Sequence, residues 1–191
     1  EQPEGNMIID IGGGTTEIAV IALSGIVADQ SIRIAGDEFT QDIVEYIKRQ
    51  HNMLIGERTG EAIKINVGSA LQDLPNPPDD YFVHGRDLLT GIPKQISVSY
   101  QEIAGALDKS ISKIEEAIMK ALEITPPELA SDIYRKGLYL TGGGALLRGL
   151  DLRLSSKTKL PVQVADDPLR AVVRGTGLAL KNRDKYTFLM S

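Results

Sequence analysis

The stretch DIGGGTTEIAV, Asp10 to Val20, places a carboxylate at the end of an apolar strand and follows it with three consecutive glycines. Each glycine costs about 1 kcal/mol relative to alanine on folding, so three together are kept where side chains would collide. Successive exposed amides in such a turn form a concave site for an anion, and the hydroxyls of Thr15 and Thr16 add donors. Asp10 would repel a phosphate unless a hydrated Mg²⁺ lay between them. The stretch therefore indicates either Mg-nucleotide binding or a tight hairpin whose glycines serve only the turn.

Two common glycine-rich phosphate loops do not fit this stretch. A Walker loop has the pattern GxxxxGK[ST] between a strand and a helix, whereas here no lysine follows and the next element is a strand. The dinucleotide fingerprint GxGxxG requires a third glycine at the position that Glu17 occupies. Any phosphate site at this turn therefore belongs to another class.

A second triple glycine occurs in LTGGGALLRG, Leu140 to Gly149. It also follows an apolar strand, and its amides could approach an adenine or a ribose closely. Two such turns, each at the carboxyl end of a strand, fit a cleft that holds one ligand from two sides. The pair favours a nucleotide site over simple turn geometry.

Composition limits the classes of function. The chain has 191 residues, 42% hydrophobic and 25% charged, which is ordinary for a globular protein. A net charge of -5 argues against a nucleic-acid binder, and the absence of cysteine excludes disulfides and thiol chemistry and favours the cytoplasm. The longest apolar run, Ile18 to Leu23, is far below the ~20 residues that cross a bilayer. The opening EQPEGN suggests a cut within a longer protein.

The hydrophobic periodicity predicts an α/β chain. Alternating apolar residues predict three antiparallel strands, and later runs predict a strand pair and two further strands, at residues 7–11, 16–23, 26–34, 81–85, 95–99, 137–141 and 161–164. Helices are also predicted. The first begins with Asp37 as its N-cap, and the second covers residues 57–65. The third begins at a capping box of Ser99 and Glu102 and runs to residue 122, a short helix after it ends at residue 133, and the last begins at residue 167. Residues 72–80 contain three prolines and predict a surface loop.

Two further expectations concern the packing of the last helix and the end of the chain. In the last helix, Gly175 and Gly177 are expected to permit close packing. The tail from Tyr186 to Met190 is either a frayed terminus or a small contact patch.

The two glycine motifs resemble the second phosphate loop and the adenosine motif of the actin and DnaK-type ATPase superfamily. The segments RIAGDEFTQDIVEYIKR, LIGERTGEAIK, PPELASDI and ADDPLRAVVRGTGLAL are similar to one branch of it, the MreB family of bacterial actin homologues. The match runs from about Met7 to Leu180 and is specific.

This resemblance implies the second half of an actin-like ATPase fold. Residues 1–35 and 134–191 would form an RNase-H-like nucleotide-binding subdomain, and residues 36–133 an inserted smaller α+β subdomain. Gly12, Gly13, Gly14 and Thr15 would hold the β and γ phosphates, and Asp10 would bind hydrated Mg²⁺ or position water. Further residues would contact ribose, base and adenosine: Glu61, Lys64, Gly142, Gly143 and Gly144.

From the residues alone, Glu61 and Lys64 have a second interpretation. They stand at i and i+3, one turn apart on a helix, which is also the spacing of an exposed ion pair on a solvated face. Without the resemblance the exposed ion pair is the preferred interpretation, and the ligand-binding role rests on the resemblance.

The resemblance also implies a function. It suggests a rod-shape-determining, ATP-dependent (or GTP-dependent) protein that forms head-to-tail filaments in the cytoplasm, beneath the membrane, with membrane-associated wall-synthesis proteins as partners. The first phosphate loop and the catalytic glutamate of the family lie upstream of Met7, so we expect this chain alone to hydrolyse ATP no faster than background. The alternatives are a non-hydrolysing scaffold module and a DnaK-type chaperone relative, which should carry a separate peptide-binding domain.

Overall fold

The structure, a computed structural model, describes residues 4–22 and 25–182, so the predicted tail at residues 186–190 lies outside it. Its larger part is built on a five-stranded mixed sheet in the order β3-β2-β1-β7-β8. The strands are β1 (Asn6–Ile11), β2 (Thr16–Ala22), β3 (Gly25–Ile32), β7 (Leu138–Thr141) and β8 (Val162–Val164). The first three form an antiparallel meander, and β7 and β8 continue the sheet in parallel beside β1. The predicted α/β class is confirmed.

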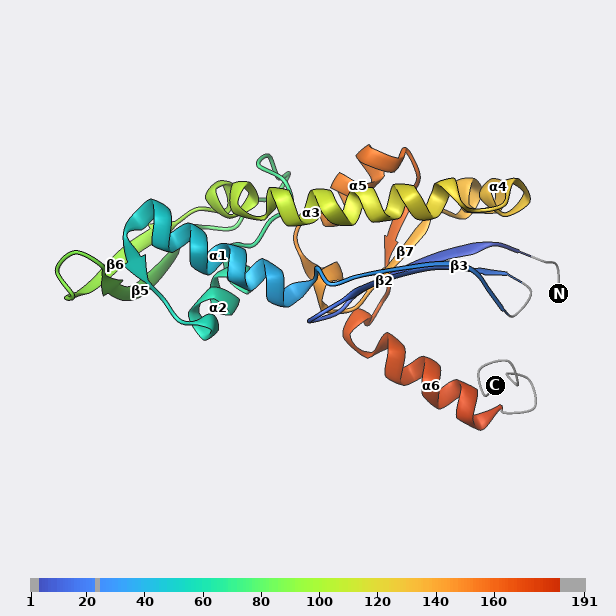
Figure 1. Ribbon diagram of the computed structural model, residues 1–191, viewed down its shortest axis with the longest axis horizontal. Coiled ribbons are helices and arrows are strands. Elements are labelled where there is room, and N and C mark those ends of the chain that lie inside the picture. Colours follow the sequence, from blue (N-terminus) through green and yellow to red (C-terminus); the bar gives the residue numbers. More distant parts are fainter. Residues whose placement is uncertain (1–3, 23–24, 183–191) are drawn as a thin grey trace.

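Helices lie on both sides of this sheet (Figure 1). On one side are α3 (Tyr100–Glu123), α4 (Pro127–Lys136) and α5 (Leu150–Thr158), and on the other is α6 (Ala171–Lys181). The alternation in β1 explains the covered face, because Met7, Ile9 and Ile11 are fully buried while the residues between them are half-buried. Two short 3-10 helices, η1 (Gly143–Leu146) and η2 (Pro168–Arg170), follow β7 and precede α6.

The smaller part of the molecule lies at the other end of its long axis (Figure 1). It contains α1 (Gly36–His51), α2 (Glu57–Val67) and a three-stranded antiparallel sheet of β4 (Met53–Leu54), β5 (Tyr81–Asp87) and β6 (Pro93–Val98). The long helix α3 contacts α1 and α2 here and β2 and β3 in the larger part. One continuous hydrophobic core therefore runs through both parts, and the division at residues 36 and 133 stays a prediction.

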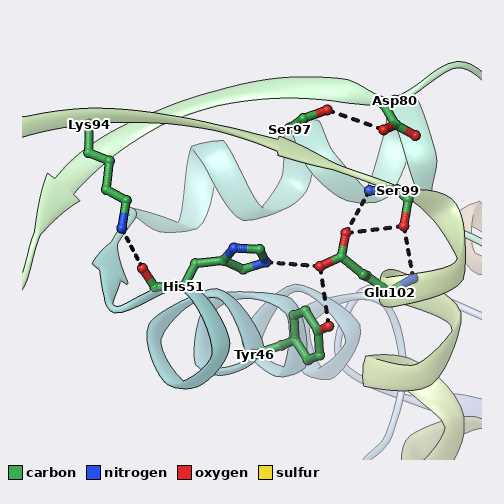
Figure 2. A network of polar contacts seen from close by, with 7 residues as sticks. All are labelled: Tyr46, His51, Asp80, Lys94, Ser97, Ser99 and Glu102. Atoms are coloured by element: carbon green, nitrogen blue, oxygen red, sulfur yellow. Dashed lines mark hydrogen bonds and ion pairs between the residues drawn. The ribbon is translucent and has the colours of Figure 1, made fainter.

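A polar network joins the last turns of α1 to the first turn of α3 (Figure 2). His51 Nε2 lies 3.0 Å from Glu102 Oε1, and the Tyr46 hydroxyl donates to the same oxygen. Glu102 Oε2 accepts from the amide of Ser99, completing the predicted capping box, and Lys94 Nζ donates to the carbonyl of His51. Burial raises the pKa of Glu102, but hydrogen bonds from Ser99 and His51 lower it by more, so the net direction is downward.

Two local predictions are wrong. Asp37 is not the N-cap of α1, because the helix begins at Gly36 after Ala35, and the amides of Gly36 and Asp37 donate instead to backbone carbonyls of the first glycine turn. Gly175 does not permit close packing against any described part of the chain, since α6 has no buried residue and a Cβ at this position would meet nothing within 4 Å among the described residues. The same holds for Gly177.

Candidate functional site

The two triple-glycine turns lie next to each other because β1 and β7 are parallel neighbours. Asp10 pairs with Thr141, so the carboxyl ends of both strands reach the same edge of the sheet. Together with the first turn of α1 and one face of α2, the turns line a cavity of about 490 Å³. The expectation of one cleft between two glycine turns therefore matches the geometry.

Six of the ten predicted site residues line this cavity: Gly12, Gly13, Glu61, Lys64, Gly143 and Gly144. The other four are neighbours in sequence of lining residues but are not part of the lining: Asp10, Gly14, Thr15 and Gly142. Gly14 and Thr15 are exposed at the tip of the hairpin between β1 and β2. Gly142 packs close to Asp10, since a Cβ on Gly142 would lie only 2.5 Å from Asp10 Oδ1.

The second glycine turn is required by the packing of the protein itself. Gly142 has φ +82°, which L side chains rarely adopt, and a Cβ there would overlap the carbonyl of Ile11. A Cβ on Gly144 would overlap the side chain of Ile11. These two glycines let β7 and η1 approach the end of β1, whatever ligand the site holds.

The first glycine turn is different, because the protein leaves space around it. A Cβ on Gly13 would meet nothing closer than the Asp37 carboxylate at 3.5 Å, and one on Gly14 nothing closer than 4.0 Å. Neither residue has a positive φ. In the described part of the chain no acceptor is recorded for the amides of Gly13, Gly14 or Thr15. Packing therefore does not explain these glycines, and their amides are free to bind an anion.

Asp10 has no cationic partner among the described residues. Burial raises its pKa, and the charge of Glu17 on the neighbouring strand raises it further. A hydrated cation would relieve both effects. Within residues 4–22 and 25–182 no group of three His, Cys, Asp or Glu could hold a metal by itself. A Mg²⁺ that keeps most of its waters and is shared with a ligand would need only a single carboxylate such as Asp10 from this chain.

Glu61 and Lys64 form an ion pair of 2.7 Å, with side chains 48% and 16% exposed. The pair is not free on a solvated face. Lys64 Nζ donates to the carbonyl of Gly36 at 2.7 Å and to the hydroxyl of Thr40 at 3.0 Å. Burial raises the pKa of Glu61, and hydrogen bonds from Lys64 and Thr40 lower it by more, so the net direction is downward. Glu61 is therefore a fixed carboxylate at the wall of the cavity.

Sequence reasoning missed the remaining lining residues: Gly36, Asp37, Phe39, Ile65, Leu146, Leu147 and Leu169. Gly36 and Asp37 reach the site because their amides donate to the carbonyls of Gly12 and Gly13, at 3.0 and 2.8 Å. The segment AGDEF does carry a visible signal, since it joins a strand directly to a helix. The apolar residues give no signal that separates them from core.

Comparisons with known proteins agree with this geometry. The family model described as MreB/Mbl protein matches residues 1–187. The cell shape-determining protein Mbl of Bacillus subtilis is 48% identical over 184 residues, covering 96% of this chain and 55% of that protein. The cell shape-determining protein MreB of Escherichia coli K12 is 49% identical over 185 residues, covering 95% and 52%. The chain thus spans about half the length of these relatives.

Solved structures give the same result for the fold. MreB 5 of Spiroplasma citri, crystallised with AMPPNP, superimposes with a TM-score of 0.92 at 39% identity, over 99% of this chain and 56% of that one. A MamK double helical filament superimposes with a TM-score of 0.69 at 22% identity, over 86% and 50%, which concerns the fold alone. The predicted actin-like fold is confirmed.

No helix of the described part is long and apolar enough to cross a membrane. The family match covers both glycine turns and the whole cavity between them. On sequence identity, coverage and fold together, the chain belongs to the MreB/Mbl family of cell shape-determining proteins.

Proposed function

We propose that the full-length protein binds Mg-ATP in the cavity between the two glycine turns and forms head-to-tail filaments that organise lateral cell-wall synthesis. The observation that carries the nucleotide site is the first glycine turn. Its amides at Gly13, Gly14 and Thr15 have no recorded acceptor among the described residues, and the space in front of them is open. Oriented free amides are what a phosphate group requires.

The roles within the site follow from its layout. The Gly12 to Thr15 turn would hold the β and γ phosphates, and Asp10 would face hydrated Mg²⁺ at the margin of the cavity. Bound Mg²⁺ would neutralise phosphate charge beside the carboxylates of Asp10 and Asp37. The second turn, with Gly143 and Gly144 in the lining, would flank the adenosine, and Glu61 with Lys64 would contact ribose and base.

The solved structures that resemble this chain provide independent support for the proposal. The MreB 5 structures of Spiroplasma citri are described as bound to AMPPNP and to ADP, and they superimpose on nearly the whole chain. Filament assembly is supported by the MamK filament of the same fold. Repeated heterologous contacts that do not close into a ring produce such filaments. Hydrolysis of ATP, a place beneath the membrane and contact with membrane-bound wall-synthesis proteins are parts of the same proposal.

Calorimetric titration of the full-length protein with Mg-ATP and Mg-GTP tests the site. Gly13→Ala is the informative variant, because a Cβ at this position would make only ordinary contact with the Asp37 carboxylate, at 3.5 Å, and would take up part of the space proposed for the phosphate. We expect a loss of affinity of at least about tenfold with an unchanged melting temperature. Gly175→Ala is the control for binding, because Gly175 is not in the cavity lining and a Cβ there meets nothing within 4 Å among the described residues.

Two outcomes would contradict the proposal. No detectable heat with either nucleotide would favour a scaffold that does not use nucleotide. Equal affinity of Gly13→Ala and the wild type for the nucleotide would show that the phosphates do not bind at this turn. Sedimentation of the full-length protein with and without Mg-ATP, followed by electron microscopy of the pellet, tests assembly independently of both.

A further inference from the structure

The hydroxyl of Thr40 lies at the centre of the polar contacts on the nucleoside side of the cavity. Thr40 belongs to α1 and is 7% exposed. Its Oγ1 lies 2.8 Å from Glu61 Oε2, 3.0 Å from Lys64 Nζ and 3.1 Å from the carbonyl of Gly36. No sequence pattern singles it out, and it is not itself part of the cavity lining.

The number of protons on this hydroxyl fixes the direction of its bonds. A threonine hydroxyl has one proton to donate and two lone pairs to accept. Lys64 donates to it, so the single proton goes either to Glu61 Oε2 or to the carbonyl of Gly36. The carboxylate is nearer and charged, and such hydrogen bonds are the stronger ones. Thr40 therefore joins the ammonium of Lys64 to the carboxylate of Glu61.

This arrangement uses one oxygen of Glu61 and leaves the other free. Oε2 accepts from Thr40 and Lys64, whereas no partner of Oε1 is recorded within the described residues. The side chain is 48% exposed at the wall of the cavity. An ionised carboxylate only accepts hydrogen bonds, so Oε1 suits a hydroxyl donor such as those of a ribose.

Gly60 makes the arrangement possible by letting α2 approach α1. A Cβ on Gly60 would lie 2.8 Å from Val44 Cγ2 and 3.2 Å from the carbonyl of Thr40. The first distance is shorter than real Cβ contacts and the second is tighter than most of them, so a side chain here would require Val44 or the backbone of α1 to shift away from α2. The close approach places Glu61 and Lys64, one and four residues further along α2, within reach of the Thr40 hydroxyl.

The same contacts continue to the phosphate turn. The carbonyl of Gly36 accepts from Lys64 at 2.7 Å, and the amide of Gly36 donates to the carbonyl of Gly12 at 3.0 Å. One turn of α1 thus links the first glycine turn to the carboxylate of Glu61.

We propose that Thr40 is a positioning residue of the nucleotide site: its hydroxyl holds Glu61 in the orientation in which Oε1 accepts a hydrogen bond from a ribose hydroxyl. The inference rests on the proposed nucleotide site and adds a determinant of ribose recognition to it. Thr40 does not touch the nucleotide and acts through Glu61.

The test compares the full-length wild type with Thr40→Val, which keeps the shape of the side chain and removes the hydroxyl, and with Thr40→Ser, which restores it. Dissociation constants are measured for Mg-ATP, Mg-2′-deoxy-ATP and Mg-3′-deoxy-ATP. We expect the wild type to prefer ATP over at least one analogue by about tenfold, as for a hydrogen bond to a charged group. Thr40→Val should reduce this preference to less than about threefold, and Thr40→Ser should retain it.

Two controls separate positioning from a structural role. A merely structural role would lower the melting temperature and weaken all three nucleotides by one factor, leaving the preference unchanged. Binding of Mg-tripolyphosphate, which has no ribose, should be the same in all three proteins. If Thr40→Val does not fold, Gly60→Ala provides the second route, because it moves α2 from α1 with the hydroxyl intact and should reduce the same preference.

The outcomes are distinct. A wild type that binds Mg-ATP but shows no preference over either analogue, or a folded Thr40→Val that keeps the full preference, overturns this inference and leaves the nucleotide site standing. A wild type without affinity for Mg-ATP overturns the nucleotide site and the inference together.

Discussion

Arg153 on α5 makes ion pairs of almost equal length with two carboxylates of α3 that differ in burial. Its Nε lies 2.7 Å from Glu115 Oε1, and one terminal nitrogen lies 2.8 Å from Asp108 Oδ1. The side chain of Glu115 is 9% exposed, that of Asp108 65%, and that of Arg153 itself 15%. Burial lowers the pKa of Arg153, and hydrogen bonds with both carboxylates raise it by more. The pairs therefore form a matched comparison of a buried and an exposed partner on one arginine.

We expect Glu115→Ala to destabilise the protein far more than Asp108→Ala. Removing one member of a buried pair costs about 3–5 kcal/mol because a charge stays buried without its partner. The lower end applies here, since Arg153 keeps Asp108 and donates to the carbonyl of Ala70 at 3.2 Å. An exposed pair contributes about 0–1 kcal/mol. At about 2–4 °C per kcal/mol for a chain of this size, Glu115→Ala should lower the melting temperature by roughly 6–12 °C and Asp108→Ala by less than about 4 °C.

Thermal and urea unfolding of each variant, alone and combined with Arg153→Ala, measures the two coupling energies directly. The Glu115 coupling should persist in high salt, whereas the Asp108 coupling should vanish, because salt screens exposed charges far better than buried ones. Glu115→Gln controls for lost volume. Equal destabilisation by the two alanine variants, or a Glu115 coupling below about 1 kcal/mol, would refute the argument from burial.

Three further predictions concern stability. Gly142→Ala should destabilise by at least about 2 kcal/mol from its positive φ and its contact with β1, whereas Gly175→Ala in the open helix α6 should stabilise by up to about 1 kcal/mol; urea unfolding measures both. Asp10→Asn should raise the melting temperature at neutral pH. The pKa of Asp10 is raised in the folded protein, so its ionised form destabilises the fold and the substitution removes that cost. The gain should disappear below pH 3.8, where Asp10 is protonated in both the folded and the unfolded state. The pKa of Glu102 is lowered in the folded protein, so its stabilising contribution is complete above pH 4.5 and is lost as the pH falls through the folded-state pKa. The melting temperatures of the wild type and Glu102→Gln, measured in thermal scans, should therefore converge in acid.

Much of the fold was predictable because its signals are local. The alternation in β1 and the capping box at Ser99 and Glu102 each lie within a few residues, and both were found where the pattern placed them. Asp37 failed as an N-cap for a non-local reason. The free amides at the start of α1, on Gly36 and Asp37, donate to carbonyls of the Gly12 to Thr15 turn. That turn lies two strands earlier in the sequence and comes next to α1 only when the sheet has formed.

The two triple glycines show the same limit at the level of the site. In sequence both read as three small residues after an apolar strand, and both suggested room for a ligand. In the structure Gly142 and Gly144 are held by contact with Ile11, whereas Gly13 and Gly14 face open space. Identical motifs thus have different physical causes, and only the neighbours across the sheet separate them.

Glu61 and Lys64 show most clearly how tertiary contacts change the role of a local sequence pattern. Their spacing predicts an ion pair on any exposed helix, and such a pair is worth little because water competes for both charges. What distinguishes this pair is the approach of α1, which Gly60 permits and which surrounds Lys64 with the carbonyl of Gly36 and the hydroxyl of Thr40. An ammonium held by three acceptors cannot swing freely into solvent, so the carboxylate beside it keeps one orientation. The same two residues become a fixed wall of a binding cavity through contacts that no i, i+3 pattern encodes.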